Sequence, residues 1–130
     1  MSAFERFILI DDNEADNVFH EIMIRRSGFG GEILIFESGI DALSFFRSDP
    51  MTQSTCILLD INMPMMSGFE MAATDLLQGK NNVVMVMLTS SGSSADRDRA
   101  STIPVIQGFL TKPVTVPVLS ELMAGSRPSA

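Results

Sequence analysis

The sequence is poor in the side chains that bind zinc and form disulfides, because its 130 residues include one cysteine and one histidine. Cys56 has no second thiol to pair with inside the chain, and its place in an apolar run predicts a buried thiol. A zinc site is not expected from one imidazole and one thiol within a strand. His20 is expected on the exposed side of a helix, and no role is assigned to it.

Basic residues are also few, with nine Lys and Arg against sixteen Asp and Glu, which gives a formal net charge of −7. The isoelectric point calculated from the sequence is about 4.5. Phosphate backbones and anionic lipid surfaces are bound by clustered Lys and Arg. Neither nucleic acid nor a membrane surface is therefore an expected partner.

Long hydrophobic runs are missing as well. No apolar run approaches the roughly 20 residues of a membrane-spanning helix, and the apolar stretch in the opening MSAFERFILIDD is too short for a signal peptide. We therefore expect a cytoplasmic protein without membrane insertion. Apolar residues make up 45% and charged residues 19% of the chain, a balance typical of one globular domain. That domain is expected over residues 1–130, with its core at about 7–123 and a frayed tail at 125–130.

Two kinds of pattern alternate along the chain. Five short apolar runs predict buried strands at residues 7–10, 33–36, 56–59, 83–88 and 105–110. Amphipathic or polar helical patterns follow them, at 15–26, from 40 to near Pro50, at 69–77, at 94–100 and at 114–123. Five such βα units with nearly continuous apolar strands predict an α/β fold, a doubly wound parallel sheet covered by helices on both faces.

Polar side chains stand where these strands end. In an open parallel sheet, ligands bind beyond the carboxyl ends of the strands. Carboxylates, hydroxyls and one lysine should therefore meet at a single edge, and they are Asp11, Asp12, Asp60, Thr89, Ser90, Ser91 and Lys112.

The charges at this edge restrict what it can do. Two carboxylates about 4 Å apart repel each other by on the order of 4 kcal/mol at an effective dielectric of 20, so three of them need a cation or protons. A few hard oxygen ligands with room for water suit Mg²⁺ better than a closed Ca²⁺ site. Beside Mg²⁺ and Lys112, the carboxylate of Asp60 can act as a nucleophile toward a phosphoryl group.

Each of these residues also has an ordinary interpretation when taken alone. Asp11 or Asp12 could cap the helix that follows, the hydroxyl cluster could simply begin a polar loop, and Lys112 could be a surface lysine. Their joint occurrence at one edge of the sheet favours the functional interpretation.

The residues that carry this pattern match a known family. Asp11-Asp12, the segment LLDINMPMMSG around Asp60, VMLTSS around Thr89, and GFLTKP around Lys112 together resemble the receiver domain of bacterial two-component response regulators. The resemblance extends from about Phe7 to Met123. It implies a flavodoxin-like three-layer sandwich with sheet order 2-1-3-4-5.

The resemblance also implies a phosphoacceptor and a Mg²⁺ site. Asp60 is similar to the aspartate that receives a phosphoryl group from a histidine kinase or histidine phosphotransfer protein. Asp12 corresponds to a direct Mg²⁺ ligand and Asp11 to an acid that holds the ion through water. Asp60 and the backbone carbonyl of Asn62 complete the implied ligand set.

Three further roles follow from the resemblance. Lys112 is similar to the lysine that pairs with the acceptor or with a phosphoryl oxygen, and Pro113 stands where the family commonly has a cis Lys-Pro bond. Thr89 and Phe109 correspond to the switch pair, in which the hydroxyl moves to the phosphoryl group and the ring swings into the space it leaves. Pro104 is a departure, because it is expected to shorten the helix before the fifth strand.

We therefore expect a stand-alone receiver, similar to a chemotaxis regulator, that signals by protein contact and catalyses only its own phosphorylation and dephosphorylation. The downstream target is unknown. One alternative is a receiver-like adaptor that works without phosphorylation. A phosphohydrolase is less favoured, because such enzymes carry a second acid where this chain has Asn62, which leaves no general acid for a leaving group.

Overall fold

Five parallel strands form one sheet in the order β2-β1-β3-β4-β5. The computed structural model describes residues 3–63, 66–68, 70, 82–90 and 93–125. The strands are β1 (Arg6–Ile10), β2 (Glu32–Phe36), β3 (Thr55–Asp60), β4 (Val83–Thr89) and β5 (Ile106–Thr111). The predicted strands and their order are confirmed, with ends that differ by a residue or two.

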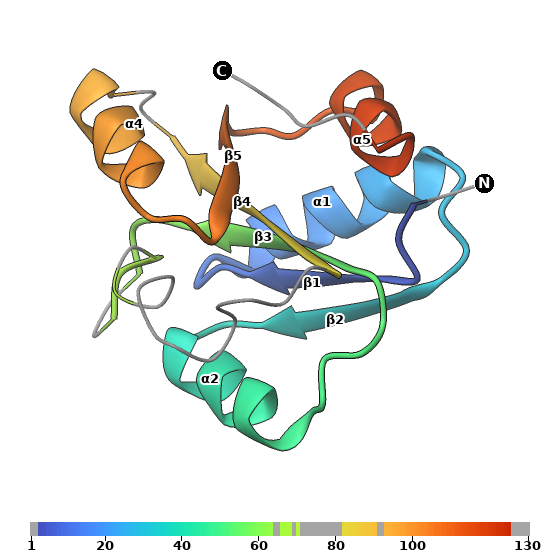
Figure 1. Ribbon diagram of the computed structural model, residues 1–130. Helices are drawn as coiled ribbons and strands as arrows, with labels where there is room; N and C mark the ends of the chain where they lie inside the picture. The colour runs from blue at the N-terminus through green and yellow to red at the C-terminus, as the bar shows by residue number, and fades with distance from the viewer. Residues whose placement is uncertain (1–2, 64–65, 69, 71–81, 91–92, 126–130) are drawn as a thin grey trace.

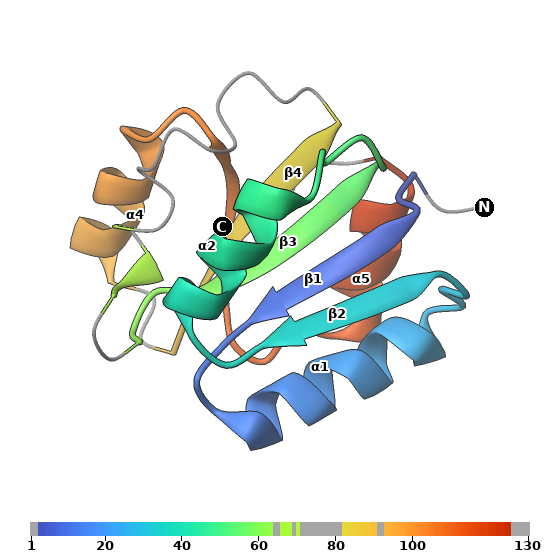
Figure 2. The same ribbon diagram turned by 90° about the horizontal axis from the view of Figure 1, so that it is seen from below.

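Four helices lie within the described residues, namely α1 (Glu14–Arg26), α2 (Gly39–Ser48), α4 (Ser94–Ser101) and α5 (Val116–Met123). Figures 1 and 2 show α1 and α5 on one face of the sheet and α2 and α4 on the other. Some of the segments discussed from the sequence lie outside the described residues, namely most of the helix predicted at 69–77, Pro64, Met65, Ser91 and the tail from 126.

The helices begin where their sequence signals indicate. The side chains of Asn13, Ser38 and Ser93 each accept a hydrogen bond from a backbone N–H in the first turn of α1, α2 and α4, respectively, which supplies a partner to a donor that the helix cannot satisfy. Helix α5 begins two residues later than predicted, with Pro117 in its first turn, where a missing N–H costs nothing. Helix α4 ends at Ser101, ahead of Pro104 as the sequence suggests.

The sheet separates two apolar layers. Alternate side chains of a strand point to opposite faces, so Phe7 and Leu9 pack with α1 and α5 while Ile8 and Ile10 pack with α2 and α4. Cys56 is fully buried in the first of these layers, as predicted, and burial raises the pKa of its thiol. Its thiol is therefore protonated and inert.

Helix α1 buries two polar residues together with Ile24, which the sequence did not predict. Asn17 and His20 are each 2% exposed, whereas Val18 and Ile22 are 48% and 45% exposed. The expectation of an exposed His20 is wrong, because its Nε2 accepts a hydrogen bond from the backbone N–H of Val114 in the segment between β5 and α5. Burial, and then the charge of Lys112, lowers the pKa of His20, so the imidazole is neutral and able to accept that bond.

Candidate functional site

The candidate site lies at the carboxyl ends of the strands. Ile10 of β1 pairs with Leu59 of β3, so the acids that follow them, Asp11 and Asp60, leave the sheet side by side. On the other side, Thr89 of β4 pairs with Thr111 of β5, which brings the next residue, Lys112, to the same edge. The parallel register thus gathers residues that are far apart in the sequence.

Three carboxylates converge at this edge. Asp11, Asp12 and Asp60 each offer an oxygen, and these oxygens lie within 4.8 Å of one another. Asp11 is 3% and Asp60 is 5% exposed, whereas Asp12 is exposed to solvent. Oxygen donors in this number, one of them open to water, fit a hard ion such as Mg²⁺. Asn62, whose backbone carbonyl is the remaining expected ligand, lies two residues beyond Asp60 in the connecting loop.

Lys112 is held by three carboxylates rather than by one. Its Nζ lies 2.6 Å from Asp11 Oδ2, 2.8 Å from Asp16 Oδ2 and 3.3 Å from Asp60 Oδ1. The side chain of Lys112 is only 13% exposed, so it is not a surface lysine. The Lys112-Pro113 peptide is cis, as the resemblance suggested.

These contacts shift the protonation of the buried groups. Burial, and then the charge of Asp11, raises the pKa of Asp60 to about 6 in spite of the nearby Lys112. Burial lowers the pKa of Lys112, but its hydrogen bonds to Asp11 and Asp16 outweigh this, and the net shift is upward. At neutral pH Asp60 is therefore mostly ionised but more basic than an ordinary aspartate, and Lys112 carries its full charge.

The loop after Asp60 closes back on the strand end. The N–H of Gly68 donates to the carbonyl of Ile61 at 2.7 Å. A Cβ at Gly68 would lie 2.4 Å from the carbonyl oxygen of Asp60, a separation that no side chain can adopt. The glycine of the LLDINMPMMSG segment therefore lets the loop approach the backbone of Asp60.

Thr89 and Phe109 lie beneath this edge. Thr89 is fully buried, and its carbonyl accepts a hydrogen bond from the N–H of Lys112 at 2.7 Å. Phe109 is only 6% exposed, and the guanidinium of Arg97 lies 5.6 Å from its ring centroid. The ring is thus largely buried in this structure, and its role as the switch partner of Thr89 stays a prediction.

The contacts of Asn13 and Asp11 show which residue caps helix α1. The cap of α1 is Asn13, whose Oδ1 accepts from the N–H of Asp16. Asp11 instead uses Oδ1 to accept the N–H of Asn13 and Oδ2 to accept Lys112. Neither Asp11 nor Asp12 is therefore the capping residue.

Two residues of the site's surroundings were missed at the level of the sequence. No role was predicted for Asp16, and His20 was expected on the exposed side of the helix. Both face the chain that follows β5, where they contact Lys112 and Val114, respectively. The available signal was their spacing, because residues four apart share one helix face.

Comparisons with known proteins identify the family. Residues 7–124 match the response regulator receiver domain. Over 119 residues, the chain is 33% identical to the transcriptional regulatory protein PrrA of Mycobacterium tuberculosis and 32% identical to that of Mycobacterium leprae. These alignments cover 92% of this chain but 47% of each relative, so the chain spans about half the length of these relatives.

Solved structures agree with this match. A response regulator receiver protein from Dyadobacter fermentans is 28% identical with a TM-score of 0.80, and the alignment covers 92% of this chain and 95% of the other. A two-component response regulator from Cytophaga hutchinsonii is 27% identical with a TM-score of 0.79, over 94% and 96% of the two chains. The chain therefore belongs to the response regulator receiver domain family, a family of two-component phosphorelay signalling.

Proposed function

We propose that Asp60 is the residue that accepts the phosphoryl group and that Asp11, Asp12, Lys112 and Thr89 assist it. The observation that carries this proposal is the position of the Asp60 carboxylate, which is buried at the end of β3. One of its oxygens lies within 4.8 Å of carboxylate oxygens of Asp11 and Asp12, and its Oδ1 lies 3.3 Å from the ammonium of Lys112. Burying a carboxylate beside other acids destabilises the fold, and such destabilised groups are typical of functional sites.

The protein's own groups support an in-line transfer. A carboxylate oxygen of Asp60 forms a bond to phosphorus while the bond from phosphorus to the donor's imidazole nitrogen breaks, and the electron pair stays with the imidazole. Lys112 neutralises charge on the phosphoryl oxygens, and we assign the Thr89 hydroxyl to the same group after transfer.

The proposed metal ligands are Asp12 directly, Asp11 through water, Asp60 and the backbone carbonyl of Asn62. When bound, Mg²⁺ supplies positive charge for the phosphoryl oxygens. The oxygen-only donor set and the proximity of its three carboxylates support this assignment.

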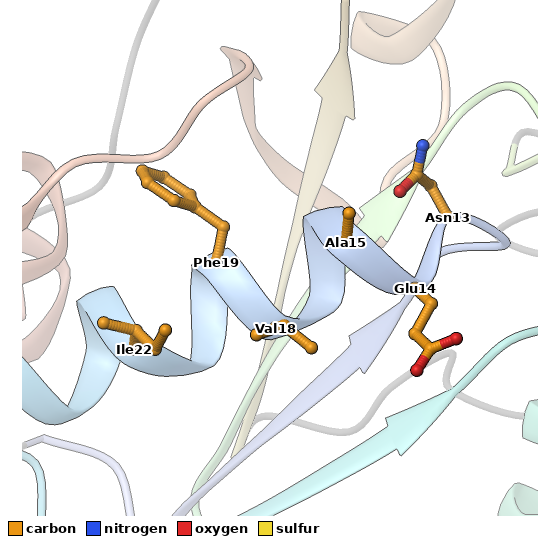
Figure 3. A pocket seen from close by; sticks show the side chains of 6 residues that line it. All are labelled: Asn13, Glu14, Ala15, Val18, Phe19 and Ile22. Atoms are coloured by element: carbon orange, nitrogen blue, oxygen red, sulfur yellow. The ribbon is translucent and has the colours of Figure 1, made fainter.

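The proposed phosphodonor is a cytoplasmic histidine kinase or histidine phosphotransfer protein, docked on the outer face of α1. Figure 3 shows Val18, Phe19 and Ile22 along this helix, and they are between 39% and 48% exposed. Helix α1 begins at Glu14, two residues after Asp12, so a protein bound to this apolar face can bring its phosphorylated side chain to the acceptor. Exposed apolar side chains in a row are typical of such a contact.

The proposed output surface is formed by α4 and β5. A groove between α4 and β5 is lined by Arg97, Ala100, Gln107 and Phe109. Movement of Thr89 toward a phosphoryl group would change the packing around Phe109, and hence the shape of this groove. Phosphorylation shifts the equilibrium only to the extent that it interacts differently with the two states.

The adaptor alternative is not favoured, because an adaptor has no need of crowded buried carboxylates. The deciding experiment is intact mass spectrometry after incubation with acetyl phosphate and Mg²⁺. We expect one added phosphoryl group on the wild type, none on Asp60→Asn and none without a divalent cation. Asp41→Asn, which removes an acid from the start of α2, is the matched control and should be labelled like the wild type. Equal labelling of Asp60→Asn and wild type would refute the assignment.

A further inference from the structure

Asp16 has no role in the function proposed so far, yet it is one of the three carboxylates that hold Lys112. An ammonium has three N–H donors, and within the described residues those of Lys112 face Asp11 at 2.6 Å, Asp16 at 2.8 Å and Asp60 at 3.3 Å. Asp60, the proposed acceptor, thus has the longest of the three contacts. The lysine is drawn toward α1.

The position of Asp16 is fixed by the start of the helix. Its backbone N–H donates to the side chain of Asn13 at 3.0 Å, and Asn17, the next residue, donates to the carbonyl of Asp11 at 2.8 Å. Asn13 therefore caps the first turn of α1, and Asn17 connects that turn to Asp11, the residue after β1. Its carboxylate is held where it meets Lys112.

The charges then conflict once Asp60 is phosphorylated. Phosphorylation replaces one negative charge by about two, and Lys112 is the cation within the described residues that is placed to neutralise them. Asp16 contacts the same ammonium, and its side chain is 38% exposed against 4% for Asp11. Asp16 therefore competes with the phosphoryl group for the ammonium of Lys112.

We propose that Asp16 is a positioning residue: its carboxylate competes with Asp60 for the ammonium of Lys112 and so limits how tightly the site holds a phosphoryl group. This inference rests on Asp60 being the acceptor. Neutralising Asp16 should release the ammonium toward Asp60. Because the pair is partly solvated, the expected gain in affinity is about twofold to fivefold.

The variant is Asp16→Asn, and the control is Glu14→Gln. Glu14 is an acid in the same first turn and is exposed at the helix start, where Figure 3 labels it. Its substitution removes the same charge and the same favourable interaction with the helix dipole but leaves the contacts of Lys112 in place. The first measurement is the NMR signal of the Lys112 ammonium and its neighbouring methylene in metal-free protein.

The second measurement is the affinity for beryllofluoride in the presence of Mg²⁺, followed through backbone amides. We expect Asp16→Asn to shift the Lys112 signal and to bind beryllofluoride about twofold to fivefold more tightly, while Glu14→Gln behaves like the wild type. Unchanged or weaker binding by Asp16→Asn, or an equal gain in Glu14→Gln, would overturn the inference. A wild type that binds no beryllofluoride would instead overturn the proposed function, so the two failures are distinguishable.

Discussion

The two ends of strand β1 carry opposite charges, and the protein treats them differently. At the amino end, Arg6 is 3% exposed and donates to Asp49 at 2.8 Å and to Thr55 at 2.9 Å. Its hydrogen bond lowers the pKa of Asp49. One cation thus meets one anion, and the pair connects β1 to the segment after α2.

At the carboxyl end the charges do not balance. Three acids, Asp11, Asp16 and Asp60, contact the ammonium of Lys112, and Asp12 adds a fourth carboxylate beside Asp11 and Asp60. Burial, and then the charge of Asp11, raises the pKa of Asp60 to about 6. The amino end is therefore arranged for stability, whereas the carboxyl end keeps a repulsion between acids that a bound metal ion can relieve.

The largest effect is expected at the balanced end. Arg6→Met should lower the free energy of unfolding by about 2–3 kcal/mol, because Asp49 and Thr55 lose a buried partner. The measurement is chemical denaturation with and without Mg²⁺. The loss should be the same under both conditions, since the metal site lies at the other end of the strand. A loss that depends on Mg²⁺ would mean that the two ends are coupled.

Removing the charge of Asp60 should instead raise the free energy of unfolding. The pKa of Asp60 is raised from 3.8 to about 6, so its contribution to stability is fully present below pH 3.8 and is lost as the pH rises through 6. In metal-free buffer, Asp60→Asn should therefore be more stable than the wild type by about 1–2 kcal/mol at pH 7.5. Near pH 4 the two should converge. A constant difference across this range would show that the ionisation of Asp60 is not the cause.

A smaller effect is expected from Asp12. An ion bound only by the folded state stabilises it, by about 1.4 kcal/mol at ten times the dissociation constant. Asp12→Asn should remove most of the Mg²⁺-dependent rise in melting temperature, and it should melt slightly higher than the wild type without metal. Differential scanning calorimetry over a Mg²⁺ series measures both. If the variant responds to Mg²⁺ as the wild type does, the ion binds elsewhere.

The strands and most of this edge were predictable because their signals are local. Apolar runs ending in Asp11, Asp60 and Thr89 mark buried strands, and a parallel sheet must bring those ends together. The sequence therefore predicted which residues meet. The contacts of Lys112 were harder to foresee, since they depend on side-chain directions that spacing alone does not give.

The burial of α1 was not predictable for a physical reason. Apolar periodicity favoured a core face through Val18 and Ile22, but Asn17 and His20 have hydrogen-bond partners in the strand end and in the segment after β5. Those bonds compensate for burying polar groups, so the helix turns these two residues inward. The position of Phe109 likewise depends on packing beneath Arg97, which strand alternation does not specify.

At the carboxyl end of the sheet, burial and the charge of Asp11 disfavour the ionised form of Asp60 until a cation binds. The direct measurement is the carbon-13 NMR titration of the Asp60 side-chain carboxyl, with and without saturating Mg²⁺. We expect a midpoint near pH 6 in metal-free protein and a much lower one with Mg²⁺, because the cation favours the ionised form. A midpoint near pH 4 without metal, unchanged by Mg²⁺, would contradict the account.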